Sequence, residues 1–148
     1  MVAIARNPHD CCKQSFPGEP CESCIEGTTP ASVRITLSGA TDGSCECSDL
    51  NGVYVLDQNP ELPCFYPSLG TGVPVCGFGD VQWFVTASII DSIVEVAIES
   101  GIFGSAHFQF DAGDTPFNCA QPRTLSLVTG GTPGGCDFSG ASVEFQPL

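Results

Sequence analysis

The chain has 148 residues, the length of one ordinary domain, and its 17 acidic residues outnumber its 4 basic ones, which gives a formal charge of −13. This charge repels a polyanion, so DNA and RNA are excluded as direct partners. Charged residues make up 14% and apolar residues 42% of the chain, which excludes a disordered acidic tail and a coiled coil. The polar surface must therefore consist largely of uncharged side chains.

Ten cysteines are more than a domain of this size needs in order to fold. Their even number allows five disulfides, and we predict that most are paired. Cys45 and Cys47 are two residues apart in an extended segment, so each is expected to pair with a different, distant partner. The disulfide candidates are Cys11, Cys12, Cys21, Cys24, Cys45, Cys47, Cys64, Cys76, Cys119 and Cys136.

The first residues, MVAIARNPHD, do not have the features of a secretory signal, because Arg6, Asn7 and Pro8 interrupt a short apolar stretch. No apolar run approaches the ~18 residues of a transmembrane helix, so we expect no membrane insertion. A cysteine-rich chain without an export signal fits a mature chain with an added Met1, a reduced zinc protein, or an assembly that is crosslinked after its release by lysis. We expect a virion or extracellular location.

Residues 1–30 contain four cysteines, four prolines and almost no periodic apolar residues. They cannot form a core of their own, so we divide the chain into a Cys-rich N-terminal arm, residues 1–30, and a β-sandwich domain, residues 31–148. We expect crosslinks and contact with a neighbouring subunit to order the arm.

Strands are predicted from Ala31 onward, where one face of ASVRITLSGA is formed by Val33, Ile35 and Leu37. Asn51 and Gly52 supply turn chemistry before a second strand, VYVL. Residues 57–80 are rich in proline and glycine, and we predict a long loop that is held through Cys64 and Cys76.

The strongest pattern is a β-meander of three segments, DVQWFVTASII, IVEVAIES and IFGSAHFQF. In the second segment the outward positions are Glu95, Ala97 and Glu99, and in the third the core positions are Ile102, Ala106, Phe108 and Phe110, with His107 outward. Further strands are predicted around Leu125 and Leu127 and around Val143 and Phe145. Seven or eight strands joined by Gly/Pro turns favour an all-β fold, an antiparallel β-sandwich of the Ig-like or jelly-roll type.

Catalytic bases are scarce, because the chain has only two histidines, His9 in the arm and His107 in a strand. The sequence has no G-x-S-x-G elbow, no phosphate-binding glycine loop and no H-E-x-x-H motif. We therefore expect no enzyme activity and no cofactor.

Two groups of residues have the chemistry of metal ligands. Four thiols within 14 residues could bind zinc, namely Cys11, Cys12, Cys21 and Cys24. Two disulfides among these four cysteines are the favoured interpretation. Two carboxylates and an amide that follow a strand could bind calcium, namely Asp111, Asp114 and Asn118. An ordinary Asp/Gly turn is the favoured interpretation of this segment.

Trp83 and Phe84 are adjacent in a predicted strand, so their side chains point to opposite faces. One of them could provide a stacking surface for a sugar, and the alternative is a central strand with aromatic packing on both sides. We favour core packing and keep both residues as a candidate binding surface.

The segment Cys45-Glu-Cys47-Ser-Asp-Leu50-Asn51-Gly52-Val-Tyr54 follows a Cys-rich head and a V-x-I-x-L strand. This C-x-C-x-x-L-N-G-x-Y motif resembles small Cys-rich β proteins of uncharacterised function that are associated with planctomycete-like bacteria and with structural regions of phages and prophages. The resemblance covers about the first half of the chain, implies a structural or surface role, and identifies no catalytic residues.

These observations favour a non-enzymatic structural protein of a virus particle, a phage capsid decoration or tail-associated protein that binds neighbouring subunits. Its partners would be copies of itself or other virion proteins, because uncharged faces pack without desolvating ions. A secreted carbohydrate-binding or adhesin module, with a glycan as partner, is the alternative, and a zinc-stabilised interaction domain is the third.

Overall fold

A computed structural model describes residues 30–43, 47–62, 64–68, 70–71, 74–75, 78–90, 93–100, 104–111, 122–132 and 135–148, and the fold is given for these residues. They form a sheet of nine strands and one short 3-10 helix. The elements are β1 (Ser32–Ser38), η2 (Cys47–Leu50), β2 (Gly52–Asp57), β3 (Phe65–Tyr66), β4 (Pro74–Val75), β5 (Phe78–Ile90), β6 (Ile93–Ser100), β7 (Gly104–Asp111), β8 (Arg123–Thr129) and β9 (Ser142–Pro147).

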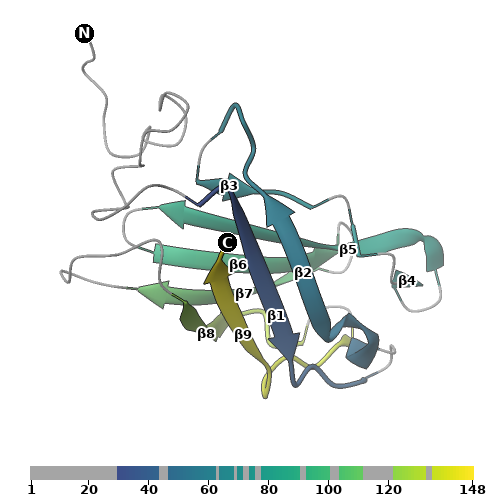
Figure 1. The fold of residues 1–148 in the computed structure, drawn as a ribbon. Helices are drawn as coiled ribbons and strands as arrows, with labels where there is room; N and C mark the ends of the chain where they lie inside the picture. The colour runs from purple at the N-terminus through teal and green to yellow at the C-terminus, as the bar shows by residue number, and fades with distance from the viewer. Residues whose placement is uncertain are drawn as a thin grey trace, which may run out of the picture.

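All strand pairs are antiparallel, and the strand order is β2-β1-β9-β8-β7-β6-β5-β3, with β4 also paired to β5. β1, β2 and β9 lie in front of β5, β6 and β7 in Figure 1, so the sheet folds into two layers. β8 joins the layers by pairing with both β7 and β9, and the register shifts between His107 and Phe108 at this corner. The predicted all-β, antiparallel fold is confirmed.

The strands from β5 to β9 are neighbours both in the chain and in the sheet, whereas β2 and β3 lie at opposite ends of the strand order. β1 pairs with β2 on one side and with β9 on the other, so the meander from β5 to β9 continues into β1 and β2. Ig-like and jelly-roll sandwiches instead contain Greek-key connections, so the strand order differs from both predicted types. The two ends of the sheet, β2 and the β3 edge of β5, come together on one open side of the sandwich.

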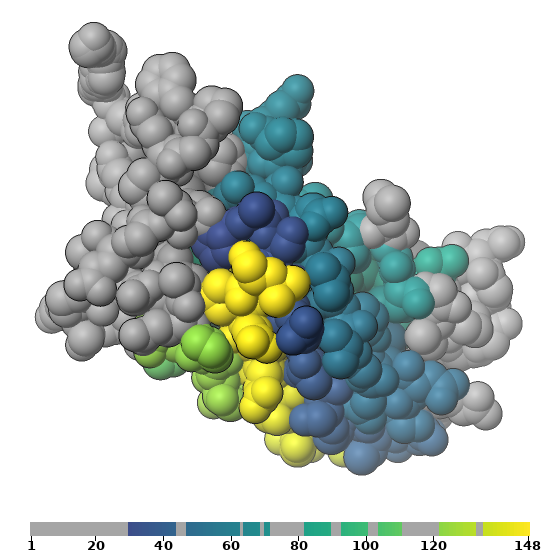
Figure 2. Space-filling view, viewed as in Figure 1, coloured from purple at the N-terminus to yellow at the C-terminus, as the bar shows by residue number. Residues whose placement is uncertain are grey.

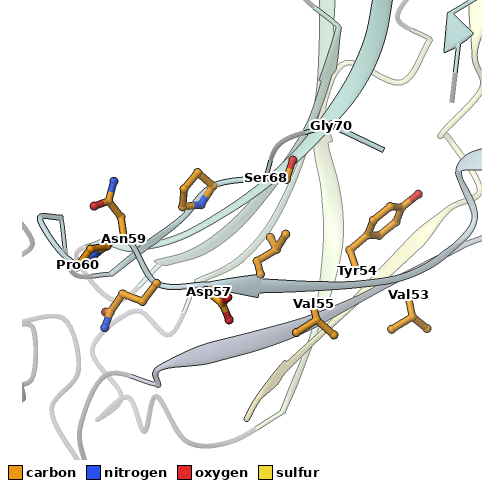
Figure 3. Close-up of a pocket in the computed structure, with 11 residues that line it drawn as sticks. Val53, Tyr54, Val55, Asp57, Asn59, Pro60, Ser68 and Gly70 are labelled. Atoms are coloured by element: carbon orange, nitrogen blue, oxygen red, sulfur yellow. The ribbon is translucent and has the colours of Figure 1, made fainter. Parts of the chain in front are cut away.

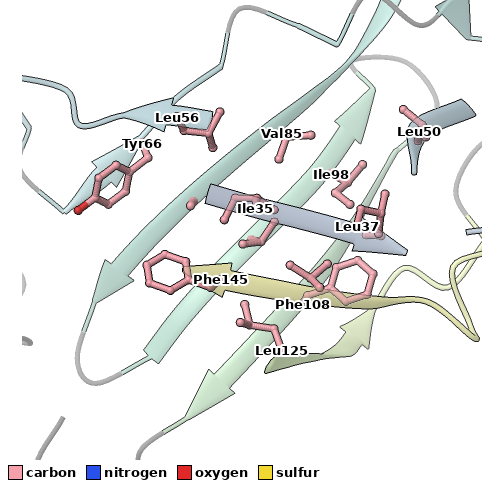
Figure 4. Packing of buried hydrophobic residues seen from close by; sticks show 14 of the residues in the cluster. Ile35, Leu37, Leu50, Leu56, Tyr66, Val85, Ile98, Phe108, Leu125 and Phe145 are labelled. Atoms are coloured by element: carbon pink, nitrogen blue, oxygen red, sulfur yellow. The ribbon is translucent and has the colours of Figure 1, made fainter. Parts of the chain in front are cut away.

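The alternating pattern of the strands builds the core. Val33, Ile35 and Leu37 of β1 are at most 1% exposed, as predicted. Each fully buried aliphatic or aromatic side chain contributes about 1.5–3 kcal/mol, so this burial dominates the stability of the fold. Figure 4 shows residues of β1 and β9 facing residues of β5, β6 and β7 across the interior, among them Ile35, Leu37, Phe145, Val85, Ile98 and Phe108.

Most predicted core positions of the meander are buried, and one position that was predicted to face outward is buried as well. Ala106 and Phe108 are fully buried, whereas Phe110 is half-buried. Ala97 was expected on the outer face but is only 7% exposed, because its short side chain lies between the register partners Thr86 and His107. Ile102 lies outside the described residues.

Residues 57–80 differ from the loop predicted for them, because β3 and β4 lie within this range and pair with the edge of β5. Between these short strands, Thr71 donates its backbone N–H to the Trp83 carbonyl at 2.9 Å, and Ser68 Oγ accepts from the Val85 N–H at 3.0 Å. The segment thereby satisfies the edge of a 13-residue strand that would otherwise expose its backbone.

One end of the sandwich is closed by a disulfide between Cys47 and Cys136, whose Cα atoms are 5.3 Å apart and whose sequence separation is 89. The distant partner predicted for Cys47 is thus confirmed. Beside the disulfide, Thr41 and Asp137 exchange two backbone hydrogen bonds of 2.9 and 3.1 Å. The connection from η2 to β1 and the connection from β8 to β9 are therefore held together at this end.

Phe138 follows this bridge and is fully buried. Its ring makes edge-to-face contacts with Trp83 and Phe108, with centroid distances of 5.9 and 6.3 Å. A side chain from the β8–β9 connection therefore fills the space between the two layers and completes the core at the disulfide end.

Candidate functional site

A groove of about 670 Å³ lies on the open side of the sandwich, between β2 and the segment that follows β3. Figure 3 shows Tyr54 projecting from β2 toward Ser68 and Gly70, whereas Val53 and Val55 project from the opposite side of the strand. The volume is in the range of ligand sites, about 300–1,000 Å³. Polar side chains line one end of the groove: Asp57, Gln58 and Asn59.

β2 is the last strand at its end of the sheet and, among the described strands, pairs with β1 alone. Gln58 donates its backbone N–H to the carbonyl of Ala31 at 2.9 Å, so the even-numbered positions of β2 point their backbone groups toward β1. The N–H and C=O groups of Val53, Val55 and Asp57 therefore point away from β1. A row of such groups is a template on which another strand can pair.

The outer face beside this edge carries two exposed apolar side chains, Val53 at 59% and Val55 at 58% exposure. Outward side chains of β1 form hydrogen bonds with both neighbouring strands: Ser32 to Asp57 of β2 at 2.7 Å, and Arg34 to Gln146 of β9 at 3.2 Å and Ser38 with Ser142 of β9 at 3.2 Å. Figure 2 shows β2, β1 and β9 side by side as one continuous surface. We call this surface, formed by the outward residues of the three strands, the β2-β1-β9 face.

The β2-β1-β9 face carries little charge. Among its outward positions the charged side chains are Arg34, Asp57 and Glu144, and the others are serine, threonine, glutamine or valine. A partner can therefore cover most of this face without desolvating an ion.

Trp83 and Phe84 point to opposite faces, as the sequence predicts. Trp83 belongs to the core at 1% exposure, and Phe84 is 38% exposed. A Cβ atom at Gly70 would lie 3.5 Å from the Phe84 ring and 2.5 Å from Gln82 Oε1. Phe84 therefore lies beside Gly70, on the side of the groove opposite β2, with its side chain partly exposed.

His107 was expected to be an exposed strand residue, and it is instead half-buried in a chain of polar contacts. Its Nε2 lies 2.9 Å from Ser105 Oγ, and its Nδ1 lies 3.4 Å from Glu95 Oε1, with the side chains of His107 and Glu95 about one-third exposed at 32% and 30%. Gln109 Nε2 donates to the other oxygen of Glu95 at 2.5 Å. The hydroxyl of Ser105, the imidazole of His107 and the carboxylate of Glu95 follow one another in the order found in a catalytic triad, where they act as nucleophile, base and orienting acid.

A hydrolytic site also needs N–H donors aimed at a developing oxyanion. β7 lies between β6 and β8, so the backbone groups from His107 to Gln109 are flanked by hydrogen-bonded strands on both sides. We therefore interpret the four side chains as a cross-strand polar ladder on the outer face of the sheet.

The other candidate residues are only partly within the described structure. Cys64 is buried and disulfide-bonded, as expected for a cysteine that holds the 57–80 segment. The zinc candidates, the side chains of the calcium candidates, and several disulfide candidates lie outside the described residues: Cys11, Cys12, Cys21, Cys24, Cys45, Cys76, Cys119, Asp111, Asp114 and Asn118. Within the described part, no group of three or more His, Cys, Asp or Glu side chains is arranged to hold a metal ion.

The described positions of the C-x-C-x-x-L-N-G-x-Y motif all serve the fold. Cys47 forms the disulfide, and Leu50 is fully buried. The Asn51 amide exchanges two 2.9 Å hydrogen bonds with the backbone of Ala40, and the Tyr54 hydroxyl donates to the Leu50 carbonyl. Half-burial of Tyr54 raises the pKa of its phenol, which keeps this donor protonated. The motif therefore stabilises the connection between β1 and β2.

Comparison with protein-family models, with curated proteins and with solved structures gives no match for this chain. The described residues contain no helix with the length and apolar composition that a membrane crossing requires. The function must therefore be argued from the groove, the open strand edge and the β2-β1-β9 face.

Sequence reasoning did not identify β2 as the candidate site. One signal was present, because Val53 and Val55 alternate with Tyr54 and Leu56, so both faces of this strand are apolar. A strand with apolar residues on both faces is expected to be covered on both faces. In the described structure only Leu56 is fully covered, at 4% exposure.

Proposed function

We propose that this chain is a non-enzymatic structural protein that binds neighbouring protein subunits through the β2-β1-β9 face and the adjoining open edge of β2. The observation that carries the proposal is the pair of valines, each more than half exposed, on a face with few charges and next to a strand edge with which no described strand pairs. Soluble monomers usually protect such an edge with lysine, proline or a covering segment. At the other end of the sheet, the 64–75 segment does cover the edge of β5.

The setting we propose is an extracellular assembly, of the kind formed by phage capsid decoration or tail-associated proteins. The Cys47–Cys136 disulfide supports an oxidising environment after assembly. A charge of −13 disfavours association through the rest of the surface, so contact would concentrate on the weakly charged face.

Self-association of the purified chain, measured by light scattering over a range of concentrations, tests this proposal. We expect oligomers in the native chain and monomers in Val53→Asp/Val55→Asp. Val128→Asp is the matched control, because Val128 is also exposed, at 49%, but lies on β8. A native chain that stays monomeric and does not bind particles would contradict the proposal, as would equal effects of the two sets of substitutions.

The N-terminal arm is expected to contribute to attachment. Deletion of residues 1–29, with Pro30 retained, should leave the far-ultraviolet circular dichroism of the β-sandwich unchanged, because the strands and the described core residues lie from Ser32 onward. We expect this truncation to weaken assembly. A truncated chain that assembles like the native one would restrict the binding surface to the sheet.

Glycan binding is a second candidate function, favoured by the exposed side chain of Phe84 beside Gly70 of the groove lining. Sugars stack on aromatic faces while amides and carboxylates bind their hydroxyls. Titration calorimetry with a panel of oligosaccharides tests this candidate: binding by the native chain that is lost in Phe84→Ala supports it, and the absence of binding contradicts it.

A further inference from the structure

We infer that the open edge of β2 accepts the segment Met1–Arg6 of a second copy of this chain as an added β-strand. The inference rests on the proposed subunit-binding function, for which it names the acceptor and the donor. The acceptor is the groove between β2 and the segment around Ser68 and Gly70.

The acceptor offers backbone groups over a length that suits a short strand. Val53, Val55 and Asp57 direct N–H and C=O groups away from β1, and β2 has six residues. At about 3.3 Å per residue, six residues span roughly 20 Å, so a six-residue donor matches the whole edge. Main-chain hydrogen bonds would provide the affinity, as in other cases of strand addition.

The donor has the side-chain pattern that this acceptor requires. In Met-Val-Ala-Ile-Ala-Arg, an extended conformation places Val2, Ile4 and Arg6 on one side, the large side, and Met1, Ala3 and Ala5 on the other. In the inferred arrangement the two alanines lie toward Tyr54 and Gly70 of the groove. The large side then lies next to Val53 and Val55 on the outer face and removes both from water.

Charge also favours this donor. Two of the chain's 4 basic residues, Arg6 and Lys13, lie in the first 13 residues, where Asp10 is the single acidic residue. The sheet region holds the other two basic residues and most of the 17 acidic ones. The start of the chain is therefore the part that a second, acidic copy attracts.

The path of the chain allows the donor to reach another copy. The carbonyl of Pro30 accepts a 2.7 Å hydrogen bond from Tyr66, and the next residue, Ala31, bonds to Gln58 at the polar end of the groove. Residues 7–29 separate this anchor from the donor. Their extended length of roughly 75 Å exceeds what is needed to reach the groove of a neighbour.

A mixing experiment with full-length chains tests the inference. The donor variant is Val2→Asp/Ile4→Asp, and the acceptor variant is Val55→Pro, which removes an N–H that faces away from β1 and so costs no bond of the β1–β2 ladder. Each variant alone should be monomeric, with self-association roughly 100-fold weaker than in the native chain. A 1:1 mixture should form heterodimers, because each mixture retains one working donor and one working acceptor.

Thermal unfolding by circular dichroism shows whether each variant is folded, and Val53→Lys is a second acceptor variant if Val55→Pro is not. Variants that remain monomeric when mixed, while the native chain associates, would overturn the inference and indicate that the donor pairs within its own chain. Native-like association of the donor variant would also overturn it. A native chain that never associates contradicts the proposed function itself, and this outcome is distinct from the other two.

Discussion

The hydroxyl of Tyr66 donates a 2.7 Å hydrogen bond to the carbonyl oxygen of Pro30, and both groups are buried. β3 presents Tyr66 next to the start of β1, so this bond fixes the point at which the chain enters the sandwich. Pro30, placed by the sequence in the N-terminal arm, is therefore an anchor point of the sheet.

Replacement of Tyr66 by phenylalanine removes this donor and leaves a buried carbonyl without its partner. We expect the free energy of unfolding to fall by about 1–3 kcal/mol, measured by urea denaturation. Tyr54→Phe is the control: its hydroxyl also donates to a carbonyl, but Tyr54 is half-buried and water can replace the bond, so the loss should be smaller. Equal losses in the two variants would contradict this assignment.

The Cys47–Cys136 disulfide restricts the unfolded chain, because it closes a loop with a sequence separation of 89. In Cys47→Ala/Cys136→Ala we expect a loss of roughly 2–5 kcal/mol in the free energy of unfolding. The double substitution removes both partners, so neither Cys47 nor Cys136 remains as an unpaired thiol. An unchanged urea midpoint with an unchanged m-value would show that other contacts hold this end of the sandwich.

Asn51 pairs with the backbone of Ala40 as a strand neighbour would, donating one hydrogen bond and accepting another. Asn51→Ala should lose about 1–3 kcal/mol of stability, because both backbone groups of a buried residue lose their partner. Asn51→Asp keeps the acceptor but not the donor, so its loss should be intermediate above pH 5. Thermal unfolding of the three proteins in parallel tests this order.

Stability should decrease in acid, because hydrogen bonds from Ser48 lower the pKa of Asp42 and those from Ser139 lower the pKa of Asp137. A carboxyl group whose pKa is lowered on folding stabilises the protein above its unfolded value, 3.8, and this contribution is lost as the pH falls through the folded pKa. The native melting temperature should therefore drop below about pH 4 more steeply than that of Asp42→Asn/Asp137→Asn. Parallel curves would contradict the assignment.

His107→Gln tests whether the polar ladder of β6 and β7 is structural. Glutamine can still bond to Ser105, and the contact with Glu95 that is lost is partly exposed to water, so stability should change by less than about 1 kcal/mol. We also expect no hydrolysis of ester substrates by the native chain above the rate of the buffer. Hydrolysis that disappears in both His107→Gln and Ser105→Ala would establish a catalytic role for these residues.

The sequence predicted the strands whose residues alternate clearly, such as β1, and it predicted that Trp83 and Phe84 lie on opposite faces. These features depend on local periodicity, which one strand carries by itself. It did not predict the edge of β2 or the covering of β5, because both depend on which distant strands become neighbours. For the same reason the sequence did not show which cysteine forms a disulfide with Cys47, since the spacing of cysteines alone does not determine how they pair.

The pairing of β1 with β9 determines how the molecule would respond to tension. Leu148 bonds to Ser32 at one end of this pair, and Ser38 lies opposite Ser142 at the other. A force applied between the two ends of the sheet region would open the pair one hydrogen bond at a time, and this requires little force. The opening would stop at the Cys47–Cys136 disulfide, because the covalent ring between these residues carries the load from there on. β2 to β8 lie inside this ring, so the chain ends would extend without tension passing along these strands.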